Sequence, residues 1–138
     1  MDPELLIQNG FNPHNKTIAK LENFDLFLGE RATLIQKNNH TVWGTIISMT
    51  ENELIKLYST PSVSDYKCVD IICQNIEGTD IKACVYILPN DYPITPPQDG
   101  DYAKQLHTVC KKMSLPSDYC DRIHEMMIEI ETNKKTQI

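Results

Sequence analysis

The sequence predicts an α+β domain, in which a small curled or partly closed β-barrel is followed by an antiparallel pair of helices. Two observations support this fold class. Apolar residues recur with a period of two between Thr17 and Leu88, and with a period of 3.6 after Asp99. The 138 residues are enough for one domain with a sizeable core and too few for two. We place that domain at residues 1–132 and expect 133–138 to form a frayed polar tail.

The first part of the chain predicts a helix, a strand and a hairpin. A short helix begins at Asp2, which suits an N-cap and precedes Pro3, and it stops at Gly10. Residues 17–28 alternate as a strand with one irregularity. Residues 31–36 and 41–49 are rich in β-branched side chains and flank the polar run Lys37-Asn38-Asn39-His40. We therefore expect them to form a hairpin around that run.

The middle of the chain predicts a second helix and a second hairpin. Thr50-Glu51-Asn52-Glu53 has the pattern of a capping box, and the helix it starts is followed by a loop at residues 59–65. Residues 68–76 and 81–88 flank Glu77-Gly78-Thr79-Asp80, which is typical of a hairpin turn. Residues 89–100 contain four prolines and are expected to cross the domain without forming a helix.

The last part of the chain predicts two amphipathic helices. Apolar positions from Tyr102 to Met113 and from Tyr119 to Ile130 recur at helical spacing. Leu115-Pro116-Ser117-Asp118 ends the first helix and caps the second. A link this short places the two helices side by side and antiparallel.

Composition excludes several functional classes. The net charge of −6 opposes binding to nucleic acid. No apolar run approaches the roughly 20 residues that span a bilayer, so we expect no membrane segment, and the first residues lack the pattern of a signal peptide. The five cysteines are odd in number and lie mostly within apolar patterns, which indicates free thiols in a reducing, cytoplasmic setting. We expect Cys68, Cys73 and Cys84 to be buried in strands.

Five stretches in order resemble the γ-glutamylcyclotransferase-like family. They are the strand Ala19–Phe27, the strand Ala32-Thr33-Leu34, Val42-Trp43-Gly44-Thr45-Ile46, Leu57 followed by Tyr66-Lys67, and Leu115-Pro116-Ser117-Asp118-Tyr119. The resemblance implies a small β-barrel with flanking helices. It also implies an activity, the attack of a γ-glutamyl α-amine on its own γ-carbonyl with release of 5-oxoproline, which needs no metal or organic cofactor.

The resemblance further implies two catalytic devices, and both are missing from this sequence. The family has a glutamate in an L-D-x-x-E-G-V segment that takes the amine proton; here Pro61 stands at the glutamate and Ser62 at the glycine. The family also has a Y-G-S-N loop that presents backbone amides to the substrate. The start Met1-Asp2-Pro3-Glu4-Leu5-Leu6 is similar to the family segment directly after that loop, so we expect the loop and its strand to be absent. The sheet edge that remains would have to be covered or paired.

These observations predict a pocket and two alternative functions. The loop 59–65 should face the strand around Trp43, with Gly44, Tyr58, Ser62 and Tyr66 completing the lining. The first alternative is a catalytically degenerate protein, which binds a small γ-glutamyl-like ligand or, through the open sheet edge, a protein partner. The second is an active cyclotransferase with Asp65 as a displaced base. Alternation along a strand should point Asp65 and Tyr66 to opposite faces.

Two further groups of His and Cys residues could form functional sites, and each is weighed against simple packing in the core. His107, Cys110, Cys120 and His124 could converge between the two helices, as zinc would require, but core packing explains them better and we expect no metal. A cysteine nucleophile with His40, His107 or His124 as base is also conceivable. No protease-like or hydrolase-like motif surrounds any of the cysteines, which disfavours that second arrangement.

Overall fold

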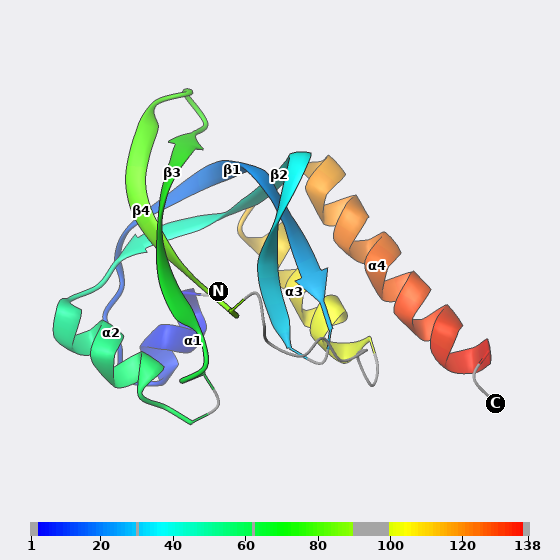
Figure 1. The fold of residues 1–138 in the computed structure, drawn as a ribbon, viewed down its shortest axis with the longest axis horizontal. Helices are drawn as coiled ribbons and strands as arrows, with labels where there is room; N and C mark the ends of the chain where they lie inside the picture. Colours follow the sequence, from blue (N-terminus) through cyan, green and yellow to red (C-terminus); the bar gives the residue numbers. More distant parts are fainter. Residues whose placement is uncertain (1–2, 30, 62, 90–99, 137–138) are drawn as a thin grey trace.

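The computed structural model describes residues 3–29, 31–61, 63–89 and 100–136 of the chain. It confirms an α+β fold, with an antiparallel sheet that is not fully closed and two C-terminal helices (Figure 1). The sheet order is β2-β1-β3-β4. The elements, in chain order, are α1 (Pro3–Gln8), β1 (His14–Leu28), β2 (Ala32–Ser48), α2 (Glu51–Tyr58), β3 (Lys67–Asn75), β4 (Asp80–Ile87), α3 (Asp101–Lys112) and α4 (Ser117–Thr136).

The first predicted hairpin is wrong, because its two arms belong to one long strand, β2 (Ala32–Ser48). Both halves of β2 pair with β1, so the sheet has four strands in the described residues where the sequence suggested five. The register passes from Glu22 opposite Thr41 to Phe24 opposite Gln36. Residues 37–40 therefore form a bulge opposite Asn23, and the predicted irregularity of the first strand lies at the same place.

Left-handed backbone geometry makes this bulge possible. Asn23 and Asn39 have φ values of 65° and 64°, a region that asparagine tolerates better than most residues. The Asn39 amide also donates to the Asn23 side chain at 3.3 Å. The polar run that suggested a turn bends β2 instead of reversing it.

The second predicted hairpin and the short helices are confirmed. β3 and β4 pair without interruption from Lys67 opposite Ile87 to Gln74 opposite Asp80, and Gly78 supplies the turn with a φ of 83°. α2 has the complete capping box, in which the Thr50 side chain accepts from the Glu53 amide. Residues 90–99 of the predicted crossing segment, and the predicted cap Asp2, lie outside the described residues.

The two ladders are joined at few points. β1 pairs with β3 at Ala19–Asn75 and Lys20–Gln74. At the other end of the second hairpin, the Tyr66 hydroxyl donates to the Ala32 carbonyl at 2.6 Å, and the Leu88 amide donates to the Thr33 hydroxyl at 2.9 Å. These contacts bring the base of the β3–β4 hairpin to the start of β2, so the sheet curls without closing.

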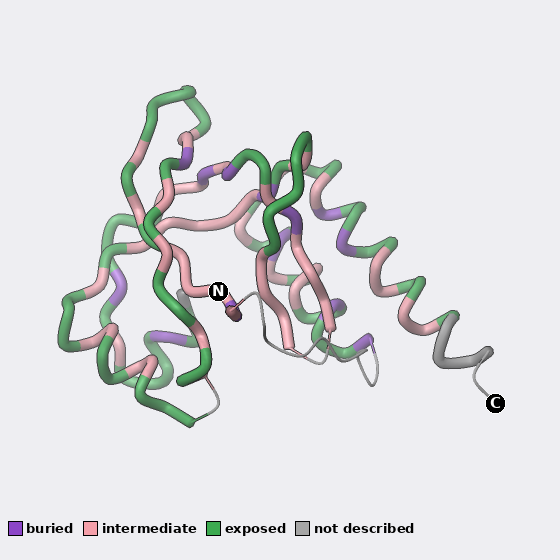
Figure 2. The backbone as a smooth tube through the Cα atoms, viewed as in Figure 1, coloured by how far each residue is buried: buried purple, intermediate pink, exposed green. Residues whose placement is uncertain are grey.

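The C-terminal helices pack as the predicted antiparallel pair. The Gly100 amide, at the start of α3, donates to Glu131 near the far end of α4 at 2.9 Å, while Cys110 meets Cys120 where the chain turns. Their interface is built on Cys110, Cys120 and Ile123, all of which are buried (Figure 2). α4 continues to Thr136, past Ile130 where the apolar pattern stops. No helix in the described ranges has the length and apolar content needed to cross a membrane.

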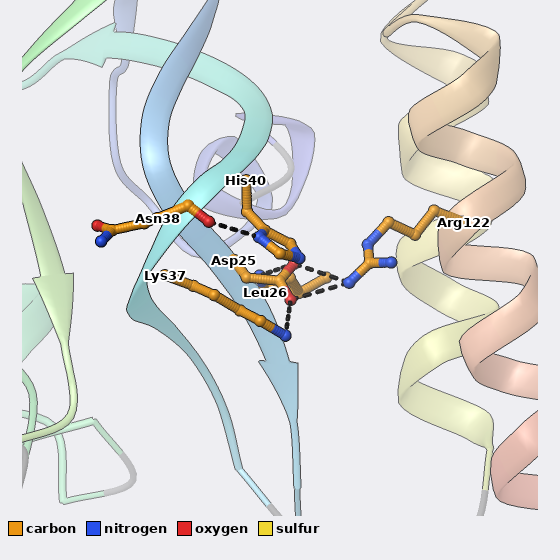
Figure 3. A network of polar contacts seen from close by, with 6 residues as sticks. All are labelled: Asp25, Leu26, Lys37, Asn38, His40 and Arg122. Atoms are coloured by element: carbon orange, nitrogen blue, oxygen red, sulfur yellow. Dashed lines mark hydrogen bonds and ion pairs between the residues drawn. The ribbon is translucent and has the colours of Figure 1, made fainter.

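A buried charge ties this helix pair to the sheet. Asp25 of β1 is 5% exposed, and its carboxylate accepts from Arg122 Nη2 of α4 at 3.0 and 2.8 Å (Figure 3). Lys37 of the bulge approaches the same carboxylate at 3.9 Å. The bulge and α4 therefore meet at one carboxylate, which fixes α4 against the bent part of the first ladder.

Candidate functional site

Strand alternation and register divide the sheet into two faces. One is the core face, where Ala19, Leu21, Val42 and Cys73 pack together with Tyr119 of α4. Because neighbouring residues alternate along each strand, the residues between these point the other way. Directly paired residues lie on the same face, so the register from β2 through β1 and β3 to β4 identifies the side chains of this second face. We call it the open face, and it contains Lys20, Trp43, Cys68, Asp70, Cys84 and Tyr86.

Two stacked tyrosines mark one end of the open face. Tyr58, the last residue of α2, stacks on Tyr86 of β4 with ring centroids 3.5 Å apart and an interplanar angle of 10°. Burial, followed by the nearby Tyr86, Cys84, Tyr66 and Cys68, raises the pKa of Tyr58 to about 12. The Tyr58 phenol is therefore protonated at neutral pH and acts as a hydrogen-bond donor, not as a base.

Two thiols lie beside these rings. Cys68 and Cys84 are exposed, so the prediction that both are buried is wrong, whereas Cys73 is buried as expected. The reason is that Cys73 faces the core, while Cys68 and Cys84 share the open face. Although the Cys84 residue is exposed as a whole, partial desolvation of its thiol, followed by the neighbouring Cys68 thiol, raises the pKa of Cys84 to about 11. Cys84 is thus a poor nucleophile at neutral pH.

Asp65, the candidate base, is held in an ion pair. Its Oδ2 lies 2.7 Å from Nη1 of Arg31, and the Asp65 side chain is 55% exposed. The same guanidinium lies 4.9 Å from the centre of the Tyr66 ring. Asp65 and Tyr66 therefore approach one group, and the prediction that they face apart is wrong. The strand rule fails because β3 begins only at Lys67, and residues 63–65 form turns.

The remaining predicted pocket residues are only partly brought together. Trp43 and Tyr58 both lie on the side of the open face, and Tyr66 is close enough to Tyr58 to affect its pKa. Gly44 lies opposite Ala19 and so belongs to the core face. Pro61 is exposed in the turn after α2, and Ser62 lies outside the described residues.

Sequence reasoning passed over Arg31, Cys68 and Cys84 as members of this site. The two thiols could have been found, because the confirmed Glu77–Asp80 turn fixes the register that places Cys68 opposite Tyr86 and Asp70 opposite Cys84. Arg31 could not, since its contact with Asp65 joins residues 34 positions apart in the chain and depends on the curl of the sheet.

The four-residue zinc arrangement is brought together only in pairs. The His107 and His124 rings lie 4.9 Å apart, and the Cys110 and Cys120 sulfurs lie 2.7 Å apart. Within the described ranges, no group of three or more His, Cys, Asp or Glu residues is arranged to hold a metal. Burial, then the positive charge of Lys111 and the neighbouring His124, lowers the pKa of His107.

Comparisons with known proteins agree on the fold. No family profile and no curated protein sequence matches the chain. Among solved structures, a γ-glutamyl cyclotransferase matches with a TM-score of 0.73 and 22% identity over 88% of this chain and 79% of its own. An uncharacterised human protein matches with a TM-score of 0.72 and 23% identity over 87% and 78%. A protein from Arabidopsis thaliana, solved in solution, matches with a TM-score of 0.56 and 18% identity over 81% and 78%. The chain therefore has the fold of γ-glutamyl cyclotransferase.

Proposed function

We propose that this protein uses the γ-glutamyl cyclotransferase fold to bind a small γ-glutamyl-like ligand without cyclising it. One observation carries the proposal. Pro61 stands where the family resemblance requires a glutamate, and the nearby Asp65 is engaged by Arg31 at 2.7 Å. The loop after α2 thus lacks a free carboxylate among its described residues to take a proton from a bound amine.

Cyclisation needs a base because an α-ammonium group cannot attack a carbonyl until it loses a proton. Tyr58 and Cys84 cannot take that proton at neutral pH. The pKa of Tyr58 is raised to about 12 and that of Cys84 to about 11, chiefly by burial in both cases. Both groups are protonated, so they suit hydrogen bonding to the carboxylate or carbonyl oxygens of a ligand.

The experiment separates binding from turnover. Trp43 is the single tryptophan of the chain and belongs to the open face, so its fluorescence reports on ligands that reach this side of the sheet. A γ-glutamyl dipeptide and a γ-glutamyl amine are titrated into the protein, and 5-oxoproline is measured in the same samples. We expect a saturable fluorescence change and no 5-oxoproline above the protein-free blank.

Variants on α2 give matched controls. Tyr58→Ala removes the ring that stacks on Tyr86 and should weaken binding about tenfold, which corresponds to the loss of about 1.4 kcal/mol. Ile55→Ala shortens a 59% exposed side chain on the same helix and should leave binding unchanged. Absence of any saturable signal would refute the ligand class. Release of 5-oxoproline that Asp65→Asn abolishes would instead establish the second candidate function, an active cyclotransferase with Asp65 as base.

A further inference from the structure

A hollow lies where β1 and β3 separate. The pairing Ala19–Asn75 and Lys20–Gln74, if continued in register, would place Leu21 opposite Cys73 and Phe24 opposite Asp70. Instead β1 stays with β2, β3 stays with β4, and the two ladders diverge (Figure 1). A cavity of about 500 Å³ occupies this fork, lined by residues 21–24 of β1, by Gln36 and Asn38 of β2, and by residues 69–72 of β3.

The lining shows that the hollow lies between strand edges. Residues 21–24 and residues 69–72 are consecutive, so side chains from both faces of each strand border it. A hollow on one face of a sheet would be lined by every second residue. Each strand has its partner on the far side, β2 for β1 and β4 for β3. Beyond Ala19 and Lys20 of β1 and Gln74 and Asn75 of β3, the backbone edges toward the hollow therefore pair with no strand among the described residues, and an unpaired edge is a template for another strand.

The edge of β3 is the better template of the two. Its pairing with β4 runs without a bulge, whereas β1 carries the irregularity at Asn23 within the hollow. Side chains along β3 also alternate in character. Val69 and Ile71 point to the core side, and Asp70 and the 62% exposed Ile72 point to the open face. The Asp70 side chain makes no hydrogen bond or ion pair with any residue in the part of the chain that the structure describes; its backbone belongs to the β3–β4 ladder.

We propose that the edge of β3 at Val69–Ile72 binds an extended basic peptide segment of a partner protein as an added strand. Apolar side chains of that segment lie beside Val69 and Ile71, and a lysine or arginine lies beside Asp70, because directly opposed residues of paired strands share a face. The net charge of −6 favours the same basic partner. This interaction uses the backbone edge of residues 69–72 and requires neither Tyr58 nor Asp65, although Asp70 also belongs to the open face.

The test uses the full chain and a synthetic six-residue peptide of alternating lysine and valine with blocked ends. Binding is measured by calorimetry, and amide hydrogen exchange locates it. We expect saturable binding and slower exchange of the amides at residues 69–72. The same peptide with its edge-facing amides N-methylated keeps its charge but cannot pair, and it should not bind.

Two charge-reversal variants serve as a matched pair. Asp70→Lys should weaken peptide binding about three- to tenfold, because an attraction becomes a repulsion. Glu77→Lys makes the same charge change in the exposed β3–β4 turn, outside the hollow, and should change binding less than twofold. A γ-glutamyl dipeptide titration of the same samples tests the small-ligand proposal separately.

Three results would overturn the proposal. They are no peptide binding at millimolar concentration, equal binding of the N-methylated peptide, and equal effects of Asp70→Lys and Glu77→Lys. Sedimentation analysis of the protein alone tests the alternative occupant of the hollow, a second copy of this chain. Self-association that excludes the peptide would show that a second copy fills the fork, and it too would refute the peptide assignment.

Discussion

Replacing Arg122 by methionine tests the contact that holds α4 to the sheet. Methionine keeps much of the apolar stem and removes the guanidinium that donates to Asp25 at 2.8 and 3.0 Å. Removing one partner of a fully buried ion pair costs about 3–5 kcal/mol, and a charged hydrogen bond contributes about 1.5–3 kcal/mol. Here the Arg122 side chain is 46% exposed and Lys37 stays near the carboxylate, so the lower range applies. We expect Arg122→Met to lower the free energy of unfolding by about 2 kcal/mol.

The assay is urea unfolding of wild type, Arg122→Met, Asp25→Asn and the double variant. Because both single changes remove the same ion pair, the double variant should lose about 1–2 kcal/mol less than the sum of the single losses. Lys104→Met removes an equal charge from the exposed side of α3 and should cost less than about 0.5 kcal/mol. A loss below about 0.5 kcal/mol for Arg122→Met, or additive losses in the double variant, would refute this reasoning.

Three further measurements test the described packing. Ile123→Ala, at 1% exposure, should cost about 2–5 kcal/mol of unfolding free energy, whereas Ile128→Ala on the same helix, at 49% exposure, should cost less than about 1 kcal/mol; equal costs in urea unfolding would show that the helix interface is misplaced. The hydrogen bond from the Asn12 amide lowers the pKa of Glu53 below 4.5, so its stabilisation is present above that pH and lost as the pH falls through the folded-state pKa. As the pH is lowered from about 6 to 3, the urea midpoint should then decrease less steeply for Glu53→Gln than for wild type. Parallel decreases for the two proteins would contradict this. Cys68 should react with iodoacetamide in the native protein, and Cys73 only on unfolding, as peptide mass spectrometry can show; modification of Cys73 at the rate of Cys68 would contradict the assigned faces.

Local sequence was a reliable guide where the structure depends on neighbouring residues. The Gly78 turn and the Thr50–Glu53 capping box are made by residues within four positions of each other, and both were predicted correctly. The run 37–40 has equally strong turn character, yet it forms a bulge. Whether a polar run reverses a strand or bends it depends on the partner strand, and here β1 pairs with both halves of β2.

The candidate site was predicted less completely for the same reason. Alternation rules assigned Asp65 to a strand that begins two residues later, so its direction was wrong. The Arg31–Asp65 ion pair forms only because the β3–β4 hairpin curls back to the start of β2, a contact that no local pattern contains. Tyr58 and Tyr66 flank the same short loop, and Tyr66 is near enough to Tyr58 to affect its pKa, whereas their place in a ligand pocket stays a prediction.

The narrow junction between the two ladders has a consequence for how the molecule opens. The β3–β4 hairpin is joined to β1 by two residue pairs, and its base is held by the Tyr66 and Leu88 hydrogen bonds to Ala32 and Thr33. Its own ladder is long and regular, so apart from these contacts it is held to the rest mainly by the core packing of Ile71, Cys73, Ile81 and Ala83. Such a segment behaves as an independent cooperative unit, whose detachment costs less free energy than global unfolding. Under mechanical load or mild denaturant we expect the hairpin to leave the core first, while the α3–α4 pair is still folded against the first ladder.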